Sequence, residues 1–382
     1  MASSSNKRHS SDSLEMSPEK ARKLFDNGGV LIVLNLPIGS VFGIDMKVYQ
    51  VGEKFLGLKM IPPGLHFIYY SAVSKDGNVA PRKGFFYFFS PQEIVMKKWD
   101  SANEDLNSMA PSGEEKQRIR ENLPNIDKNL GPYPYQVLKD WTRLTCNISV
   151  SSIESLVNQL QPECGFVSSV TEFVPQNFPI QESTEPDSTT EKRFQTLEEK
   201  YLPNMKQVPG TEIRFTEIPK NKYPDGCSAS QITKHNMDST YVLEQLLEHY
   251  QNKEDILGEL QMAHVCFLIA HVYDAFEHWK NLVQVFCSVD AGLESYEDFM
   301  KTFLTILHYQ LKEIPSDFFV DITSSNNFLV NTLQVFFENV KESNTNEQFR
   351  KFVDNFRKNL TKTLKWDFET VPDDEQPVIV EL

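Results

Sequence analysis

The sequence predicts an α+β protein: an N-terminal antiparallel β-rich domain, either a sandwich or an open barrel, with covering helices, and an all-α C-terminal domain. Short β-branched and aromatic runs fill the first hundred positions, helical periodicity fills the last two hundred, and a polar, disordered linker separates them. The expected boundaries are 1–16 for a disordered tail, 17–161 for the N-terminal domain, 162–208 for a flexible linker, 209–366 for the helical domain and 367–382 for an acidic tail.

Bulk properties favour a protein partner over nucleic acid or a membrane. The 382 residues carry a net charge of -15, which repels phosphate backbones, and no local basic patch stands out. The chain shows neither the apolar core of a signal peptide nor a run long enough to span a membrane. Its five cysteines are widely spaced, without C-x-x-C, as reduced thiols are. We therefore expect the protein in cytoplasm and nucleus.

Six short runs predict the strands of the N-terminal domain. They occupy residues 30–34, 47–51, 55–61, 65–71, 85–90 and 94–99, and Gly- and Pro-rich turns such as 62–64 separate them. A short helix from Ser17 ends at Asn27, before the first strand. Helices that begin at Ser112, ending before Pro124, and near Pro134 and Ser149 are expected to cover the sheet.

Residues 162–208 are rich in Ser, Thr, Pro, Gln and charge, and too poor in apolar residues to build a core. This composition predicts a linker between the domains. Its hydroxyl groups are candidates for phosphorylation, which adds charge: Ser183, Thr184, Ser188, Thr189 and Thr190.

The helical domain is organised around residues 255–287. Apolar residues there recur by steps of three and four, which on a helix form one continuous stripe: Met262, Val265, Ile269, Val272, Phe276, Trp279, Val283 and Phe286. The sequence leaves open whether this is one long helix or a hairpin near Ala270 and His271. Flanking patterns at 242–249, after Ser295, at 328–340 and at 349–364 bring the expected total to some six helices.

No metal, cofactor, small-molecule substrate or catalytic centre is expected. His264, His271 and His278 recur every seven residues, about 10 Å apart along a helix, whereas one zinc gathers its ligands at about 2.1 Å each. None of the common hydrolase, metalloprotease or nucleotide-binding motifs is present. A pairing of Cys146 or Cys266 with a distant histidine stays open.

Residues 82–89 are similar to the aromatic RNA-stacking motif of RRM domains. Phe86 replaces the small residue of that motif and Ser90 its last aromatic, so we interpret the segment as a core strand.

The C-terminal end combines an acidic, proline-punctuated segment with a β-branched run: Val378, Ile379, Val380, Glu381 and Leu382. Such a run suits the addition of a strand to the sheet edge of a partner, and docking on its own β domain is the alternative.

Ten ordered stretches carry a resemblance to a known family. They include LGLKMIPPGLHFIYYS (56–71), NLGPYPYQVLKDW (129–141), LGELQMAHVCFLIAHVYDAFEHWK (257–280), IPSDFFVDI (314–322), LTKTLKWDF (360–368) and PVIVEL (377–382). On these stretches the chain resembles the A1-cistron splicing factor family, whose members assist assembly of the U5 small nuclear ribonucleoprotein.

The resemblance implies a non-enzymatic factor for pre-mRNA splicing. It implies binding to the large U5 scaffold protein through that protein's RNase H-like and MPN-like domains, and contact with other U5 proteins. It also implies that this binding keeps an RNA helicase off the immature particle. Residues 378–382 would add the strand at that contact. Two alternatives stay open: an adaptor recognised through Val380 and Leu382 as a PDZ-type ligand, and a hydrolase with a site between the domains.

Overall fold

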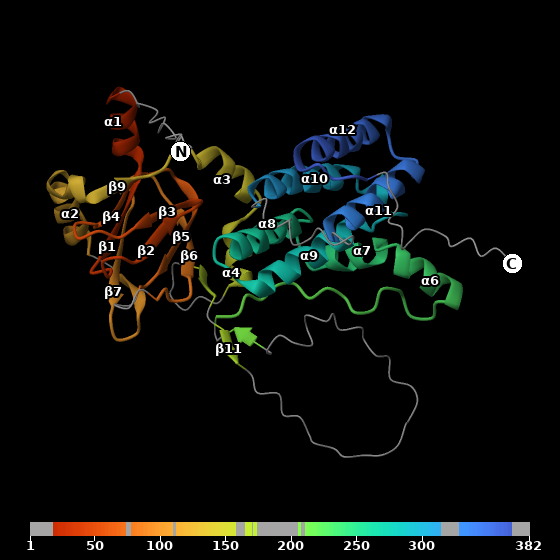
Figure 1. Cartoon of the computed structure of the whole chain (residues 1–382), viewed down its shortest axis with the longest axis horizontal. Helices are drawn as coiled ribbons and strands as arrows, with labels where there is room; N and C mark the ends of the chain where they lie inside the picture. Colours follow the sequence, from red (N-terminus) through yellow and green to blue (C-terminus); the bar gives the residue numbers. More distant parts are fainter. Residues whose placement is uncertain are drawn as a thin grey trace, which may run out of the picture.

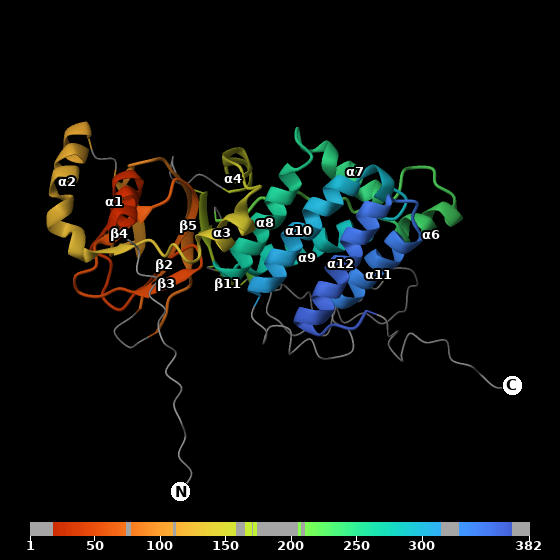
Figure 2. The same ribbon diagram turned by 90° about the horizontal axis from the view of Figure 1, so that it is seen from above.

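The computed structural model describes residues 18–73, 78–109, 112–157, 165–169, 171–173, 205–207, 211–314 and 328–368. Its N-terminal half is built on two β-sheets and its C-terminal half is entirely helical, and the two halves lie side by side (Figures 1 and 2). This confirms the predicted α+β class. The two sheets form a sandwich, and the described strands close no barrel.

Each sheet has five strands. The first has the order β8 (Asp105–Met109), β7 (Ile94–Asp100), β1 (Gly29–Leu34), β4 (Gly57–Ile61) and β9 (Leu130–Pro132). The second has the order β10 (Gly165–Ser168), β6 (Lys83–Phe89), β5 (Gly64–Ser71), β2 (Val41–Ile44) and β3 (Lys47–Gln50).

The first sheet is mixed, which corrects the prediction of an antiparallel domain. β1 pairs in parallel with β7, and β4 pairs in parallel with β9. The chain leaves β1 for the second sheet and returns at β7, so the direction of the returning strand depends on the path through both sheets. A hydrophobic pattern within one strand carries no information about that path.

Strand β1 is buried on both faces, which explains its unbroken apolar run. Leu31 and Val33 point into the core between the two sheets. Val30 and Ile32 point to the outer face of the first sheet, where helix α2 (Gly113–Ile126) covers them with Ile119, Leu123 and Ile126.

Ser112 caps helix α2 as the sequence predicts, and Glu115 completes a capping box. The helix continues past Pro124 to Ile126, whereas the sequence predicted an end before the proline. The apolar contacts of its last turn on β1 and β7 hold it to the sheet, and these contacts come from the tertiary fold. A short helix α1 (Pro18–Asn27) precedes β1, and η1 (Asp127–Asn129) follows α2.

Helices α3 (Leu138–Thr145) and α4 (Val150–Leu156) lie between the second sheet and the helical half (Figures 1 and 2). Their buried side chains, Trp141, Leu144, Ile153 and Leu156, fill the space between the two halves, whereas residues such as Val150 stay exposed.

Part of the predicted linker joins the second sheet. β10 pairs antiparallel with β6 over four residues, and Val167 in this strand is fully buried. Farther along, β11 (Thr171–Phe173) pairs with β12 (Met205–Gln207). The assignment of all of 162–208 to a linker was therefore too broad, because the polar average of the stretch concealed a strand of four residues.

The described helical half contains seven α-helices, one more than the sequence suggested. They are α6 (Ala229–Met237), α7 (Thr240–Glu248), α8 (Asp255–Leu268), α9 (Tyr273–Cys287), α10 (Glu297–Glu313), α11 (Phe328–Glu342) and α12 (Glu347–Leu364), with a short η2 (Leu293–Ser295) before α10. None of these helices is long and apolar enough to cross a membrane.

Residues 255–287 form a hairpin of α8 and α9, which settles the question that the sequence left open. His271 adopts a left-handed backbone conformation with φ of 61°, and the amide of Val272 donates to the carbonyl of Cys266. The apolar stripe is thereby divided. Its N-terminal members face a core between the two halves, and Trp279, Val283 and Phe286 face the core of the helical half.

Candidate functional site at the junction of the two halves

The residues that the sequence singled out for partner binding and phosphorylation lie outside the described residues. These are Val378, Ile379, Val380, Glu381 and Leu382 at the C-terminal end, and Ser183, Thr184, Ser188, Thr189 and Thr190 in the predicted linker. The described residues bring together a different region, the junction between the second sheet and the hairpin of α8 and α9. Sequence reasoning did not find this junction, because its residues come from segments far apart in the chain.

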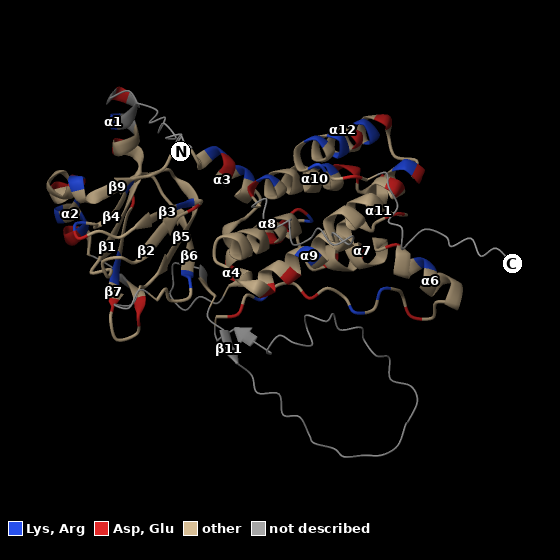
Figure 3. Cartoon of the chain, viewed as in Figure 1, with Lys and Arg blue, Asp and Glu red and all other residues tan. Residues whose placement is uncertain are grey.

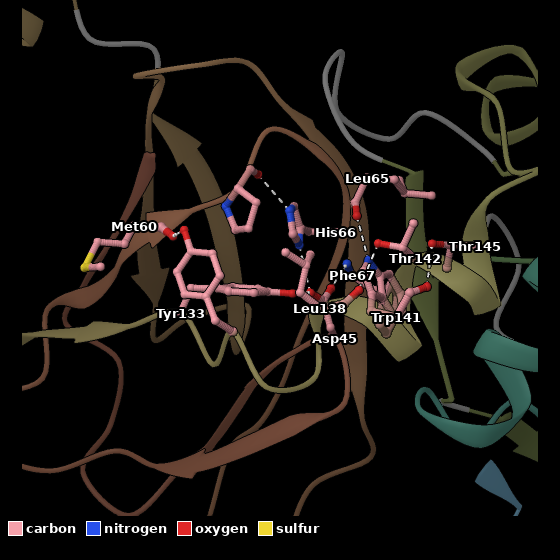
Figure 4. Close-up of polar contacts among 12 residues, drawn as sticks. Asp45, Met60, Leu65, His66, Phe67, Tyr133, Leu138, Trp141, Thr142 and Thr145 are labelled. Atoms are coloured by element: carbon pink, nitrogen blue, oxygen red, sulfur yellow. Dashed lines mark hydrogen bonds and ion pairs between the residues drawn. The ribbon is translucent and has the colours of Figure 1, made fainter. Parts of the chain in front are cut away.

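A buried polar network anchors the sheet side of the junction (Figure 4). Asp45 accepts three hydrogen bonds: from the backbone amide of Phe67 at 2.9 Å, from the hydroxyl of Tyr133 at 2.6 Å and from Nδ1 of His66 at 2.8 Å. The other ring nitrogen of His66 lies 2.8 Å from the carbonyl oxygen of Pro62. Both nitrogens of His66 therefore lie within hydrogen-bond distance of an oxygen, which fixes the orientation of the ring.

Tyr133 donates in this network and does not ionise. Burial, the charge of Asp45 and the hydrogen bond to Asp45 together raise the pKa of Tyr133 well above its usual value. Asp45 and His66 are 0% and 1% exposed, so no substrate reaches them. The trio resembles a catalytic arrangement in composition only, and its role is to hold the Asp45 turn, the β5 strand and the segment after β9 together.

Trp141 of α3 connects this network to the helices of the junction. Its Nε1 donates to the carbonyl oxygen of Leu65 at 2.7 Å, and its ring is 1% exposed. The ring belongs to an apolar cluster that spans both halves of the molecule, with Phe67 and Phe86 from the sheet and Met262 and Val265 from α8. Burial of these large side chains stabilises the junction, at about 25 cal/mol per Å² of apolar surface.

Burial in this cluster also decides the interpretation of residues 82–89. Phe85 and Phe86 are 3% and 1% exposed in β6, so they are core residues with no face free for stacking on a base. This confirms the core-strand interpretation.

Hydrogen bonds cross the junction at two further places. Gln261 of α8 is fully buried, accepts from the amide of Asn147 at 2.8 Å and donates to the carbonyl of Arg143 at 3.0 Å. Arg82, the residue before β6, donates to the carbonyl of Ile269, and its guanidinium lies 4.9 Å from the centre of the Tyr69 ring. Because both halves contribute partners, the junction behaves as an interior surface.

A second polar cluster ties the chain after the linker to the hairpin. The carboxylate of Glu259 accepts from Thr216 and Tyr250 and lies 2.7 Å from Nε2 of His278. Burial acts to raise the pKa of Glu259, but the hydrogen bonds from His278, Tyr250 and Thr216 outweigh it, so the pKa falls below its usual value. Phe215 stacks on the ring of His278 at 4.4 Å. This cluster fixes the start of the helical half.

The three regularly spaced histidines occupy three separate environments. His264 is buried beside Trp279, His271 lies in the hairpin turn and His278 contacts Glu259. Across the described residues, no three side chains of His, Cys, Asp or Glu converge as metal ligands would.

An open groove of about 410 Å³ runs between α3 and α10 at the edge of the junction. Its lining is Thr142, Arg143, Cys146, Lys301, Thr302, Thr305, Ile306 and Tyr309. The guanidinium of Arg143 lies 4.5 Å from the centre of the Tyr309 ring. Cys146 is exposed here, but the lining holds no His, Asp or Glu that would activate a thiol, which disfavours hydrolysis at this groove.

Cys266, the other thiol considered for such a pairing, is fully buried, and burial raises the pKa of its thiol. A protonated thiol in an apolar core is a poor nucleophile.

These features are typical of a binding or assembly protein. The two domains are joined, the buried titratable groups serve packing, and the groove has no acid–base pair. Comparison with known proteins agrees. The protein-family model of the AAR2 N-terminal domain matches residues 27–162, and the family model of the AAR2 C-terminal repeat region matches residues 215–369. The chain belongs to the AAR2 family.

Relatives match along nearly the whole chain. Protein AAR2 homolog of Mus musculus is 41% identical over 97% of this chain and 98% of its own length, and that of Homo sapiens is 40% identical over 97% of both. A1 cistron-splicing factor AAR2 of Saccharomyces cerevisiae is 21% identical over 74% of this chain and 76% of its own length. The name of the yeast relative describes a splicing factor, and the family resemblance found in the sequence is confirmed.

Proposed function

We propose that this protein is a pre-mRNA splicing factor that assists assembly of the U5 small nuclear ribonucleoprotein. It binds the large U5 scaffold protein through the scaffold's RNase H-like and MPN-like domains. The observation that carries this proposal is membership of the AAR2 family across both halves of the chain, with a relative whose name describes a splicing factor.

The junction supports a role as a preformed platform. The sheet and the helical half share one apolar cluster and the Gln261 hydrogen bonds, so both present their surfaces in a fixed relation. A platform that is rigid before binding loses less conformational entropy when it binds. A scaffold with two domains to be held together is a suitable partner for such a surface.

The mechanism is competition by mass action. While this protein occupies the scaffold, the RNA helicase that acts later finds fewer free sites, and its apparent affinity falls. At a concentration one hundred times the dissociation constant, the effect is about 2.7 kcal/mol, which is about a hundredfold. Phosphorylation of the linker or tail would weaken this contact and permit exchange.

The tail is proposed to add a strand to the scaffold through residues 378–382. A chain truncated after Gln376, and a full chain with Ile379→Pro, should both bind scaffold fragments more weakly in a pull-down, because proline removes a ladder donor. Glu381→Gln is the matched control, since it keeps the backbone donors and the β-branched neighbours. Undiminished binding of both altered chains would remove the tail from the mechanism.

The competition is tested with the scaffold fragment bound to a labelled helicase. Addition of this protein should displace the helicase in a concentration-dependent manner, and helicase binding that is unaffected at saturation would contradict the proposal. Affinity purification from nuclear and cytosolic extracts tests the expected cytoplasmic and nuclear location, because U5 proteins should be recovered from both.

A further inference from the structure

Helix α12 carries a local cluster of basic residues that the sequence analysis did not detect. Residues 347–365 hold six basic and two acidic side chains in a protein whose net charge is -15. Lys and Arg follow one another along this helix in Figure 3. We define the basic end of α12 as Arg357, Lys358, Lys362 and Lys365.

The charge of the basic end is only partly compensated within α12. Asp354 lies 2.6 Å from Lys358 and 3.3 Å from Arg357. Lys362 and Lys365 are exposed and take part in no ion pair among the residues that the structure describes. Positions 358, 362 and 365 follow at steps of four and three, so their ammonium groups lie along one exposed face of the helix.

The chain reverses direction at the end of α12. Lys365 is in the left-handed conformation, with φ of 61°, and the two aromatic residues that follow are buried. The ring of Phe368 lies 5.1 Å from that of Phe337 in α11, and Phe337 lies 6.3 Å from Phe356 in the middle of α12. The chain therefore leaves the described region beside the helix it has just completed.

The next segment is opposite in charge. Residues 366–377 include five acidic side chains and no basic one: Asp367, Glu369, Asp373, Asp374 and Glu375. From Phe368, seven extended residues reach about 23 Å, whereas the basic end spans about 12 Å of helix. Residues 369–375 are therefore long enough to reach each cation of the basic end.

We propose that the acidic segment 369–375 docks on the basic end of α12 in the isolated protein. The short tether gives the acidic segment an effective concentration in the millimolar range. The pairing is electrostatic and solvent-exposed, so salt weakens it. Docking holds residues 378–382 near the helical half, and a partner that takes up this end must first displace the acidic segment.

Carbodiimide cross-linking of the isolated full chain tests this proposal. The reagent joins a lysine amine to a carboxylate that it contacts, and mass spectrometry locates the link. Links between Lys358, Lys362 or Lys365 and residues 369–375 are expected, independent of protein concentration and several-fold weaker at high salt. The exposed pair of Lys351 and Glu347, 2.7 Å apart, is the internal positive control. A cross-link between Lys351 and Glu347 without any cross-link between the basic end and residues 369–375 would overturn the proposal.

Charge reversal supplies a second measurement. Lys358→Glu with Lys362→Glu should raise the amide exchange rate of residues 369–375 several-fold. The matched control is Lys116→Glu with Arg118→Glu on the exposed face of α2, which should leave that rate unchanged, and circular dichroism verifies folding of both chains. Equal exchange rates in all three proteins would contradict docking.

A rival occupant of the basic end is RNA. Single-stranded oligouridine that binds the full chain through Lys358 and Lys362, in the absence of a tail cross-link, would overturn the proposal and assign this surface to RNA. Because these measurements use the isolated chain, their failure leaves the proposed scaffold binding untouched, and failure of scaffold binding leaves the docking intact.

Discussion

Gly258 of α8 and Asn147, which follows α3, meet backbone to backbone at the junction. A Cβ built at position 258 would lie 2.3 Å from the carbonyl oxygen of Asn147, closer than real Cβ atoms approach. This contact lets α8 lie directly against the connection between α3 and α4, where Gln261 one turn later completes the hydrogen bonds. The glycine in the first turn of α8 is thus explained by the approach of the two halves.

Gly258→Ala is therefore expected to lower the free energy of unfolding by about 1–3 kcal/mol, because backbone must shift to admit the methyl group. Urea denaturation measures the change. Gly113→Ala at the first turn of α2 is the control, since a Cβ there meets nothing within 4 Å, and stability should be unchanged or raised by up to about 1 kcal/mol. Equal effects of the two substitutions would contradict the close approach.

Gln261→Leu should cost about 1–3 kcal/mol. The substitution leaves the partly buried amide of Asn147 and carbonyl of Arg143 without their partner, and such groups lose solvation without full compensation. Gln117→Leu on the exposed face of α2 is the matched control. If both variants unfold at the same urea concentration as the unchanged protein, the junction does not depend on these hydrogen bonds.

His264 makes stability depend on pH. Burial lowers the pKa of His264 from 6.5 to about 3, so the folded protein keeps it neutral while the unfolded chain binds a proton below pH 6.5. Stability is therefore full above pH 6.5 and falls as the pH drops toward 3. Between pH 7 and pH 5 the free energy of unfolding falls by about 2 kcal/mol. The fall begins near the unfolded pKa of 6.5, and each of the roughly 1.5 pH units below it costs about 1.36 kcal/mol.

Urea midpoints at several pH values test this dependence. His264→Leu should flatten the fall between pH 7 and pH 5, whatever its effect on absolute stability. His249→Leu at an exposed position is the control and should keep the original slope. A His264→Leu protein with the original slope would show that another group titrates in this range.

Tyr133 and Tyr135 permit a comparison of a buried and a partly buried hydrogen bond. Tyr133 donates to Asp45 at 2.6 Å, and Tyr135 donates to the carbonyl of Met60 at 2.7 Å. Tyr133→Phe should cost about 1.5–3 kcal/mol, because its acceptor is a carboxylate, and Tyr135→Phe about 0.5–1.5 kcal/mol. Thermal unfolding of the two variants measures the difference. A larger loss for Tyr135→Phe would contradict the central position of Asp45.

The strands and helices with strong local signals were predictable. The aromatic and β-branched content of residues 65–71 and 85–90 predicts β5 and β6. Ser112 and Ser149 predict the starts of the helices that they cap. The parallel neighbours β1 and β7 were not predictable, because strand direction depends on how the chain crosses between sheets. β10 was not predicted, because one buried valine hardly changes the average hydrophobicity of the polar stretch that contains it.

The candidate site was less accessible to sequence reasoning than the fold. Gln261 and Asn147 belong to no motif, and Arg82 belongs only to the RRM-like run that forms a core strand. The importance of these residues lies in contacts between residues more than one hundred positions apart. The basic end of α12 was overlooked for a related reason. Its lysines are separated by polar and apolar residues in the sequence, and only helical geometry places them on one face.

By itself, the sequence determined the α+β class, most elements, the acidic charge and the family, because periodicity, capping residues and matching stretches are local properties of the chain. The tertiary structure decided that residues 255–287 turn back at His271, that the apolar stripe divides between two cores, and that the two halves close on each other at Gly258. These outcomes depend on which surfaces exclude water together, and that is a property of the packed chain alone.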